Sequence, residues 1–470
     1  MKSFFWIFGL SIILVVLLST SGFGDVAGVD NTTTVKAFQD QGFLVGEGIM
    51  QTTNPIGLYN AGITPSCYAN NPTSPYMQFK VPKAPGQMVN NTISDAPINP
   101  ANAGLWLDYR MRSDEAFVYV GTTPPECVYF SYIGYIALRY SPEIKTDHRI
   151  FASLGDSISL SRLKSEPAYQ SNVFSQPIII IFTADKNTEQ KAKTALLKAG
   201  YPDGIIHTLV IPKELVNFGL DAYSDTFSTL NRMALFKNQT EGNEYINSSP
   251  GLVYRLTPET EGQTDYYAVP KLIPRGTGTT QELDLNDDLQ KLREAIVSQY
   301  GEDHVENLTT QVWIFEGYDA IQRGVDALAD IRDTVYLNTT STVLGDKPGE
   351  SIIVFGVNHA ASGKATYSNF GVYGGKALNG INGYSNVDYA GTAEKFLPGN
   401  PNAKYLYVAK ISRSEDPDYK TIVIPFGVGA NGIEANDTCF VGFRTYVEPE
   451  TGVSPAWSEI LYDQAIKITP

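Results

Sequence analysis

Residues 178–211 read IIIIFTADKNTEQKAKTALLKAGYPDGIIHTLVI, and this stretch predicts a compact β-α-β unit. The short continuous apolar run at 178–182 is typical of a strand that is buried on both faces of a sheet. Asn187 can cap a helix, and Gly200 is placed to end it. Residues 205–211 are apolar again and predict the second strand of the unit.

A second pattern of similar size follows further along the chain. Residues 286–299 and 318–331 each repeat apolar side chains at helical spacing, and residues 311–315 between them can form a strand. Together with the first unit, these segments predict a ferredoxin-like α+β unit over residues 171–335.

The regions on both sides of this unit have a different pattern. Residues 29–170 alternate turn-rich, proline-containing stretches with short aromatic and β-branched runs such as 127–138. The same pattern returns in residues 336–470, with apolar runs at 352–357 and 404–411. We therefore expect an α+β fold in which β-rich, sandwich-like N- and C-terminal parts flank the α/β unit. The two flanks could pair into one sandwich, with the α/β unit inserted.

The N-terminus carries the signal of an exported chain. Lys2 precedes the apolar run Phe4–Leu18, and small residues follow it. This order predicts a signal peptide within residues 1–28, cleaved after Gly24 or Gly28. An uncleaved N-terminal anchor is the alternative, because a membrane span needs about 17 to 25 apolar residues. We expect an extracellular or cell-surface location, with membrane contact only through this segment if it is uncleaved.

The charge balance limits the classes of partner. The chain has 35 Lys and Arg against 50 Asp and Glu, which gives a formal net charge of -15, and the basic residues do not cluster. A nucleic-acid partner is therefore not expected, because binding to phosphates needs a basic patch. Seven N-x-[ST] sequons permit glycosylation of an exported chain, at Asn31, Asn90, Asn238, Asn247, Asn307, Asn338 and Asn436.

The three cysteines are Cys67, Cys127 and Cys439, and their spacing matches neither a zinc site nor a redox motif. No metal and no cofactor is therefore expected. Sequence alone allows any of three disulfide pairings. We favour Cys67 with Cys127, because both lie in the N-terminal β part.

One stretch has a recognisable catalytic setting. Residues 149–160 read RIFASLGDSISL, with Gly155, Asp156 and Ser157 following an apolar run. This stretch resembles the nucleophile block of the GDSL, or SGNH, esterases and lipases. The resemblance implies that Ser157 attacks an ester carbonyl, with the help of oxyanion donors and a histidine base. The alternative is a turn in which Gly155 and Asp156 bend the chain between two strands.

The later blocks of that family match less well. Residues 356–359, Gly-Val-Asn-His, loosely resemble the oxyanion block, which would make Asn358 an oxyanion donor and His359 the first residue to test as base. The D-x-x-H block is missing, because Lys or Gly stands three residues before each of the four histidines. Ser157, Asn358 and His359 are thus catalytic candidates, and the catalytic set stays unknown.

The stretch 359–402 is rich in Gly, Asn, Ser and Tyr. Aromatic faces next to adaptable amides suit the recognition of a carbohydrate or a peptide. An ordinary long surface loop is the alternative. The sequence as a whole predicts an exported binding or structural protein of unknown activity, and the alternative is a GDSL-like serine esterase centred on Ser157.

Overall fold

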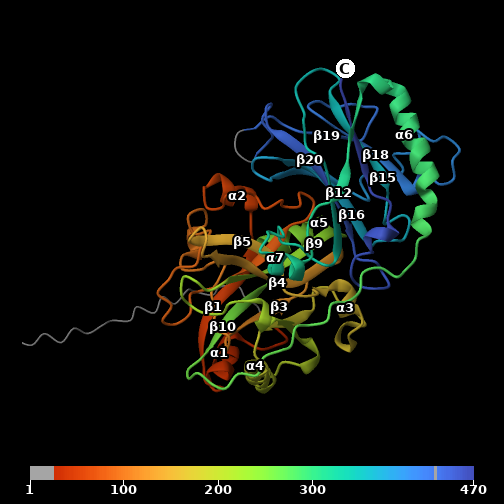
Figure 1. Ribbon diagram of the computed structural model, residues 1–470. Helices are drawn as coiled ribbons and strands as arrows, with labels where there is room; N and C mark the ends of the chain where they lie inside the picture. Colours follow the sequence, from red (N-terminus) through yellow and green to blue (C-terminus); the bar gives the residue numbers. More distant parts are fainter. Residues whose placement is uncertain (1–25, 428–430) are drawn as a thin grey trace, which may run out of the picture.

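The computed structural model describes residues 26–427 and 431–470 of the chain (Figure 1). It shows a mixed α+β protein with several sheets. The predicted signal peptide lies almost wholly outside the described residues. In the described part, no helix is long and apolar enough to cross a membrane. The same part contains seven α-helices: α1 Asn31–Gln39, α2 Pro55–Asn60, α3 Leu160–Lys164, α4 Lys186–Ala199, α5 Gln239–Asn247, α6 Asn286–Tyr300 and α7 Gly317–Arg323.

The first sheet has ten strands, in the order β5-β4-β9-β2-β1-β10-β3-β7-β8, with the short β6 beside β4. All neighbouring strands in it are antiparallel except β7 and β8. Its strands are β1 Phe43–Thr52, β2 Tyr76–Lys80, β3 Ala116–Thr122, β4 Cys127–Ser141, β5 Thr146–Ser153, β6 Ile158–Ser159, β7 Pro177–Thr183, β8 Ile206–Val210, β9 Thr226–Phe236 and β10 Gly251–Pro258.

The second and third sheets belong to the C-terminal half. The second has the order β11-β21-β15-β18-β19, and the third has the order β12-β13-β20-β16-β17 with β14 beside β20. Their strands are β11 Val305–Leu308, β12 Thr310–Val312, β13 Thr334–Thr339, β14 Thr342–Val343, β15 Ser351–Val357, β16 Tyr367–Gly374, β17 Gly380–Ser385, β18 Leu406–Ser412, β19 Thr421–Val423, β20 Thr438–Tyr446 and β21 Gln464–Ile468.

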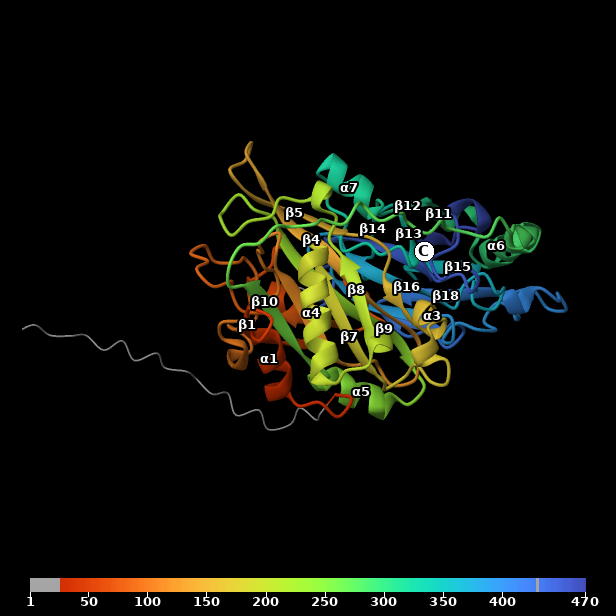
Figure 2. The same cartoon turned by 90° about the horizontal axis from the view of Figure 1, so that it is seen from below.

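The predicted β-α-β unit is present as β7-α4-β8, with β7 and β8 parallel and adjacent (Figure 2). The side chain of Asp185, rather than Asn187, caps α4 by accepting from the backbone N–H of Thr188. The helix ends at Gly200, whose φ of 108° lies in the left-handed region. Local sequence signals are thus enough to define this element.

The ferredoxin-like unit is not confirmed, because its expected halves pack in different places. The strands β7 and β8 join the first sheet next to β3. By contrast, α6 packs on the second sheet, against side chains of β15 and β18 that include Phe355 and Val408. The helix expected at 318–331 is shorter than predicted, since α7 ends before Gly324, which has a φ of 64°.

The sheets form successive layers. The second and third sheets pack face to face through a shared apolar core that includes Val354, Phe370 and Val441, as in a β-sandwich. The third sheet meets the first through Tyr129 and Tyr446. Figure 1 shows α6 outside the second sheet, whereas α1 and α4 lie on the far side of the first. The two β-rich flanks therefore meet by side-chain packing and by backbone hydrogen bonds such as that from Cys67 N–H to the carbonyl of Ala377, whereas no strand of one flank pairs with a strand of the other in the described residues.

The expected disulfide is wrong, because Cys67, Cys127 and Cys439 are all free and buried. Cys67 packs against Ala377 of the C-terminal half, whereas Cys127 belongs to the core of the first sheet. The two thiols thus belong to separate apolar clusters. Burial raises the pKa of both Cys67 and Cys127 to about 12.

Candidate functional site

Ser157 lies in the turn between β5 and β6 and is buried. Its hydroxyl donates to both carboxylate oxygens of Asp333 at 2.8 Å. Asp333 also accepts from the hydroxyl of Tyr129 at 2.8 Å. Burial raises the pKa of Asp333 to about 6. The partner that the structure gives to Ser157 is therefore a buried carboxyl group.

His359 lies in the C-terminal half, between two carboxylates. Its Nδ1 is 3.0 Å from Glu282, and its Nε2 is 3.4 Å from Asp463. Burial lowers the pKa of His359, but the two carboxylates outweigh burial and raise it to about 10. The imidazole is therefore a cation at neutral pH and links the segment before α6 to the segment before β21.

Asn358 is bonded within the same half. Its side-chain amide donates to the carbonyl of Asn386 at 3.1 Å and accepts from the N–H of Ala361 at 3.2 Å. Asn358 and His359 are thus neighbours, and neither is hydrogen-bonded to Ser157. The structure does not bring the three candidates from the sequence together in one site.

The tyrosines of residues 359–402 are mostly core residues. Tyr367, Tyr373 and Tyr389 are buried, and the hydroxyl of Tyr384 donates to the carbonyl of Thr421 at 2.6 Å. Their rings fill the space within and beside the third sheet, where Tyr389 stacks on Tyr407 with ring centres 4.0 Å apart. The tyrosines of this stretch therefore pack in the core more than they form an exposed aromatic surface.

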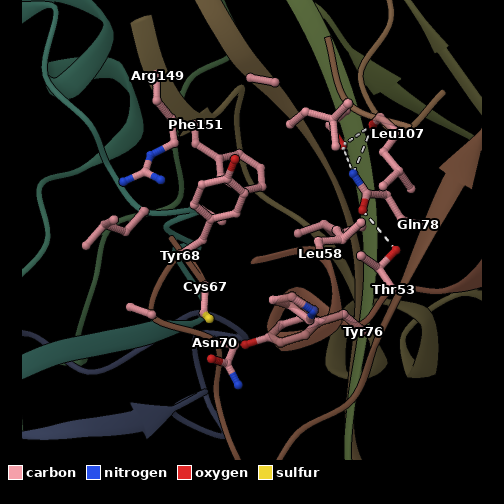
Figure 3. Close-up of a pocket in the computed structure, with 18 of the residues that line it drawn as sticks. Thr53, Leu58, Cys67, Tyr68, Asn70, Tyr76, Gln78, Leu107, Arg149 and Phe151 are labelled. Atoms are coloured by element: carbon pink, nitrogen blue, oxygen red, sulfur yellow. Dashed lines mark hydrogen bonds between the residues drawn. The ribbon is translucent and has the colours of Figure 1, made fainter. Parts of the chain in front are cut away.

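The structure points instead to a pocket between the first and third sheets (Figure 3). Its cavity volume is about 80 Å³. Strands β2, β4, β5 and β9 of the first sheet line it, together with β13 and β20 of the third and the loop that follows α2. Most of its wall is apolar, with polar groups at a few positions, as is usual for small-molecule sites.

Polar side chains of the wall are already ordered. The amide of Gln78 donates to the carbonyl of Leu107 at 2.9 Å and accepts from the hydroxyl of Thr53 at 3.0 Å (Figure 3). Arg149 forms an ion pair with Asp326 and lies over the ring of Tyr68, 4.3 Å from its centre. This arginine is therefore neutralised within the protein.

Two other arginines reach the pocket from opposite sheets. Arg232 comes from β9 of the first sheet and Arg444 from β20 of the third, and both are buried. Tyr336 connects them, because its hydroxyl accepts from Arg232 at 3.3 Å while the Arg444 guanidinium lies 5.6 Å from its ring centre. Neither arginine has a carboxylate within ion-pair distance among the described residues.

The backbone around this pocket adopts rare conformations. In the described residues, eleven non-glycine residues have a positive φ, and five of them line the pocket: Tyr68, Ala69, Phe151, Leu328 and Ala329. Such conformations cost about 1–3 kcal/mol each and gather at functional sites. Their concentration here supports the assignment of the pocket as the candidate site.

The sequence contains a signal for this site that residue motifs do not reveal. Arg232 and Arg444 each stand in the middle of a strand whose neighbours are largely apolar, as in Met233-Ala-Leu-Phe236 and Phe440-Val-Gly-Phe443. A charged residue in a buried strand needs a partner, so such positions are candidates for a ligand site or for a buried ion pair.

Comparison with known proteins adds little. No protein-family model matches this chain, and no curated protein does. Among solved structures, the chain is similar to an uncharacterised protein from Burkholderia cenocepacia, with 9% sequence identity and a TM-score of 0.40 over 93% of this chain and 84% of that chain. A likeness of this degree assigns neither a family nor an activity.

Proposed function

We propose that this chain is an exported or surface-anchored binding protein that holds a small molecule in the pocket between its first and third sheets. The observation that carries the proposal is the coincidence, in one pocket, of an apolar wall, a few convergent polar side chains and the five residues with strained backbone. The proposed export rests on the apolar run Phe4–Leu18 that follows Lys2 in the sequence.

The pocket is built as a binding site rather than a reaction centre. Gln78, Arg149 and Asp108 each already have hydrogen-bond or ion-pair partners from the protein. A rigid wall of this kind lowers the entropy cost of holding a ligand.

A thermal-shift screen tests the proposal. The panel holds small sugars, dipeptides, short carboxylic acids and the matching amides, and each hit is confirmed by calorimetry. We expect saturable binding by at least one class. A ligand at one hundred times its Kd should stabilise the protein by about 2.7 kcal/mol.

A variant that fills the pocket tests whether a ligand binds there or elsewhere on the protein. Leu58 lines the pocket and is buried, so Leu58→Trp should abolish binding. Leu197→Trp is the matched control, because Leu197 on α4 is exposed. A folded wild-type protein that binds nothing in the panel, or binding that survives Leu58→Trp, would contradict the proposal.

A further inference from the structure

We infer that the ligand of this pocket is a small monocarboxylate whose carboxylate group is bound by Arg232 and Arg444. This inference rests on the proposed binding function and specifies the chemistry of the ligand. Arg232 and Arg444 lie on different sheets and line one cavity, so a single anionic group there would contact both halves of the molecule.

The described part of the chain has five buried arginines, and three of them have carboxylate partners: Arg110 with Asp147, Arg255 with Glu115, and Arg332 with Asp156 and Glu316. The two without a carboxylate are Arg232 and Arg444, and both line this pocket. A buried charge is costly unless it is paired, so an anion from outside would complete the pattern.

Arg232 and Arg444 both have N–H donors that no group of the described residues uses. A guanidinium has five N–H donors. Arg232 uses three of them, on the hydroxyls of Tyr135 and Tyr336 and on the carbonyl of Ala329, and its Nε is buried without a hydrogen-bond partner. Arg444 uses two, on the hydroxyl of Tyr373 and on the carbonyl of Ala69. Donors therefore remain for a ligand.

Aromatic rings fix the orientation of both guanidinium groups. Arg232 lies 5.5 Å from the ring centre of Tyr76 and 5.8 Å from that of Tyr135. Arg444 lies 5.4 Å from the ring centre of Tyr373. Planar groups held in this way are suited to the planar fork of a carboxylate.

The volume of the cavity and the charge of its wall limit the class of ligand further. An apolar cavity of about 150 Å³ holds benzene, so a cavity of about 80 Å³ holds a smaller molecule. Leu230 and Leu328 in the wall suit a short aliphatic chain. Asp108 also lines the cavity, where it accepts from the backbone N–H groups of Thr92 and Ile93, and its negative charge repels a dianion such as phosphate more strongly than a monocarboxylate.

Two nearby acids, Asp330 and Asp333, bond to other groups than the two arginines. Asp330 accepts from the backbone N–H and the hydroxyl of Ser153, and Asp333 accepts from Ser157 and Tyr129. Neither carboxylate contacts a guanidinium group of the pocket. Asp330 and Asp333 lower the positive potential in the pocket without bonding to Arg232 or Arg444. The unused N–H donors of the two arginines therefore stay available for a ligand.

The experiment compares propionate, which is smaller than benzene, with propionamide, which has nearly the same shape but no charge. Calorimetry at pH 7 should show that propionate binds at least ~10-fold more tightly, because hydrogen bonds to a charged group are stronger than neutral ones. Arg232→Gln and Arg444→Gln should each remove this preference, whereas Arg232→Lys should keep part of it. Arg323→Gln, on the exposed face of α7, is the matched control and should leave it unchanged.

Other outcomes separate this inference from the proposed function. Equal binding of propionate and propionamide overturns the inference and leaves a binding protein for neutral ligands. Binding of inorganic phosphate as tightly as propionate overturns the inference that the ligand is a monocarboxylate. Binding of a sugar or dipeptide from the wider panel, with no binding of propionate, has the same consequence. If an arginine variant unfolds, the comparison of propionate with propionamide on the wild type still decides.

Discussion

Single residues in this molecule owe their properties to charge and burial more than to their sequence motifs. Ser157 has the neighbours of a catalytic serine in sequence, but in space it donates to Asp333. His359 follows an oxyanion-like triplet, but in space it is a cation between Glu282 and Asp463. Each motif therefore acquires a structural explanation once its partners are known.

We predict that Ser157→Ala does not change the hydrolysis of short-chain nitrophenyl esters, because a serine is a weak nucleophile without a base to take its proton. The variant should lose about 1–3 kcal/mol of stability, since Asp333 would lose a buried donor. Ester turnover that is abolished by the substitution would instead establish the esterase hypothesis. Urea unfolding measures the change in stability.

We predict that His359 stays protonated up to about pH 9. Its folded pKa is raised from 6.5 to about 10, so its contribution to stability is complete below pH 6.5 and is lost as the pH rises through 10. The free energy of unfolding should fall in this range by up to about 1.4 kcal/mol per pH unit from this group. Side-chain NMR of His359 checks the protonation state, and titration near pH 6.5 would refute the prediction.

Individual helices and strands were predictable where their signals are local. The β-α-β unit at 178–211 and the helix at 286–299 appear as β7-α4-β8 and α6, because apolar period and end signals lie within each segment. The arrangement of these elements was not predictable. β9 pairs with β4 and β2, which are distant from it in sequence. The third sheet then packs on the first, and this packing brings Arg232 and Arg444 to one pocket.

Helix α7 packs closely against strand β5. Gly317 is the first residue of α7, and a Cβ there would collide with the backbone and side chain of Ser153. Gly317→Ala should therefore destabilise the protein by about 1–3 kcal/mol.

The matched control for Gly317 is Gly262→Ala, since nothing lies within 4 Å of a Cβ at Gly262. Thermal unfolding of both variants measures the difference. Equal stability of the two variants would show that α7 can move away from β5 at little cost.

At the scale of the whole molecule, one long connection joins the two halves. Residues 259–280 run from β10 towards α6, shown in green in Figure 1. Backbone N–H groups of this connection donate to Asp185, Asp156 and Glu459, which belong to different parts of the fold. Lys364 then holds Glu459 and Glu448 at 2.5 and 2.7 Å, and donates to the carbonyl of Thr279.

We predict that Lys364→Met destabilises the protein by about 3 kcal/mol, because it leaves two buried carboxylates without a cation. Lys376→Met is the control, because the Lys376–Glu434 pair is exposed and its loss should not be measurable. Urea unfolding of both variants tests this, and equal stability would show that Lys364 does not hold the connection in place.

Arg232 and Arg444 together form the proposed carboxylate site in the pocket between the first and third sheets. The most direct measurement is NMR of the protein with isotope-labelled arginine, in which the Nε–H signals of these two residues are assigned through Lys variants. During titration with propionate, both signals should shift together and reach saturation, and propionamide should leave them unchanged. Shifts confined to exposed arginines such as Arg323, or no shift at all, would show that Arg232 and Arg444 do not bind a carboxylate.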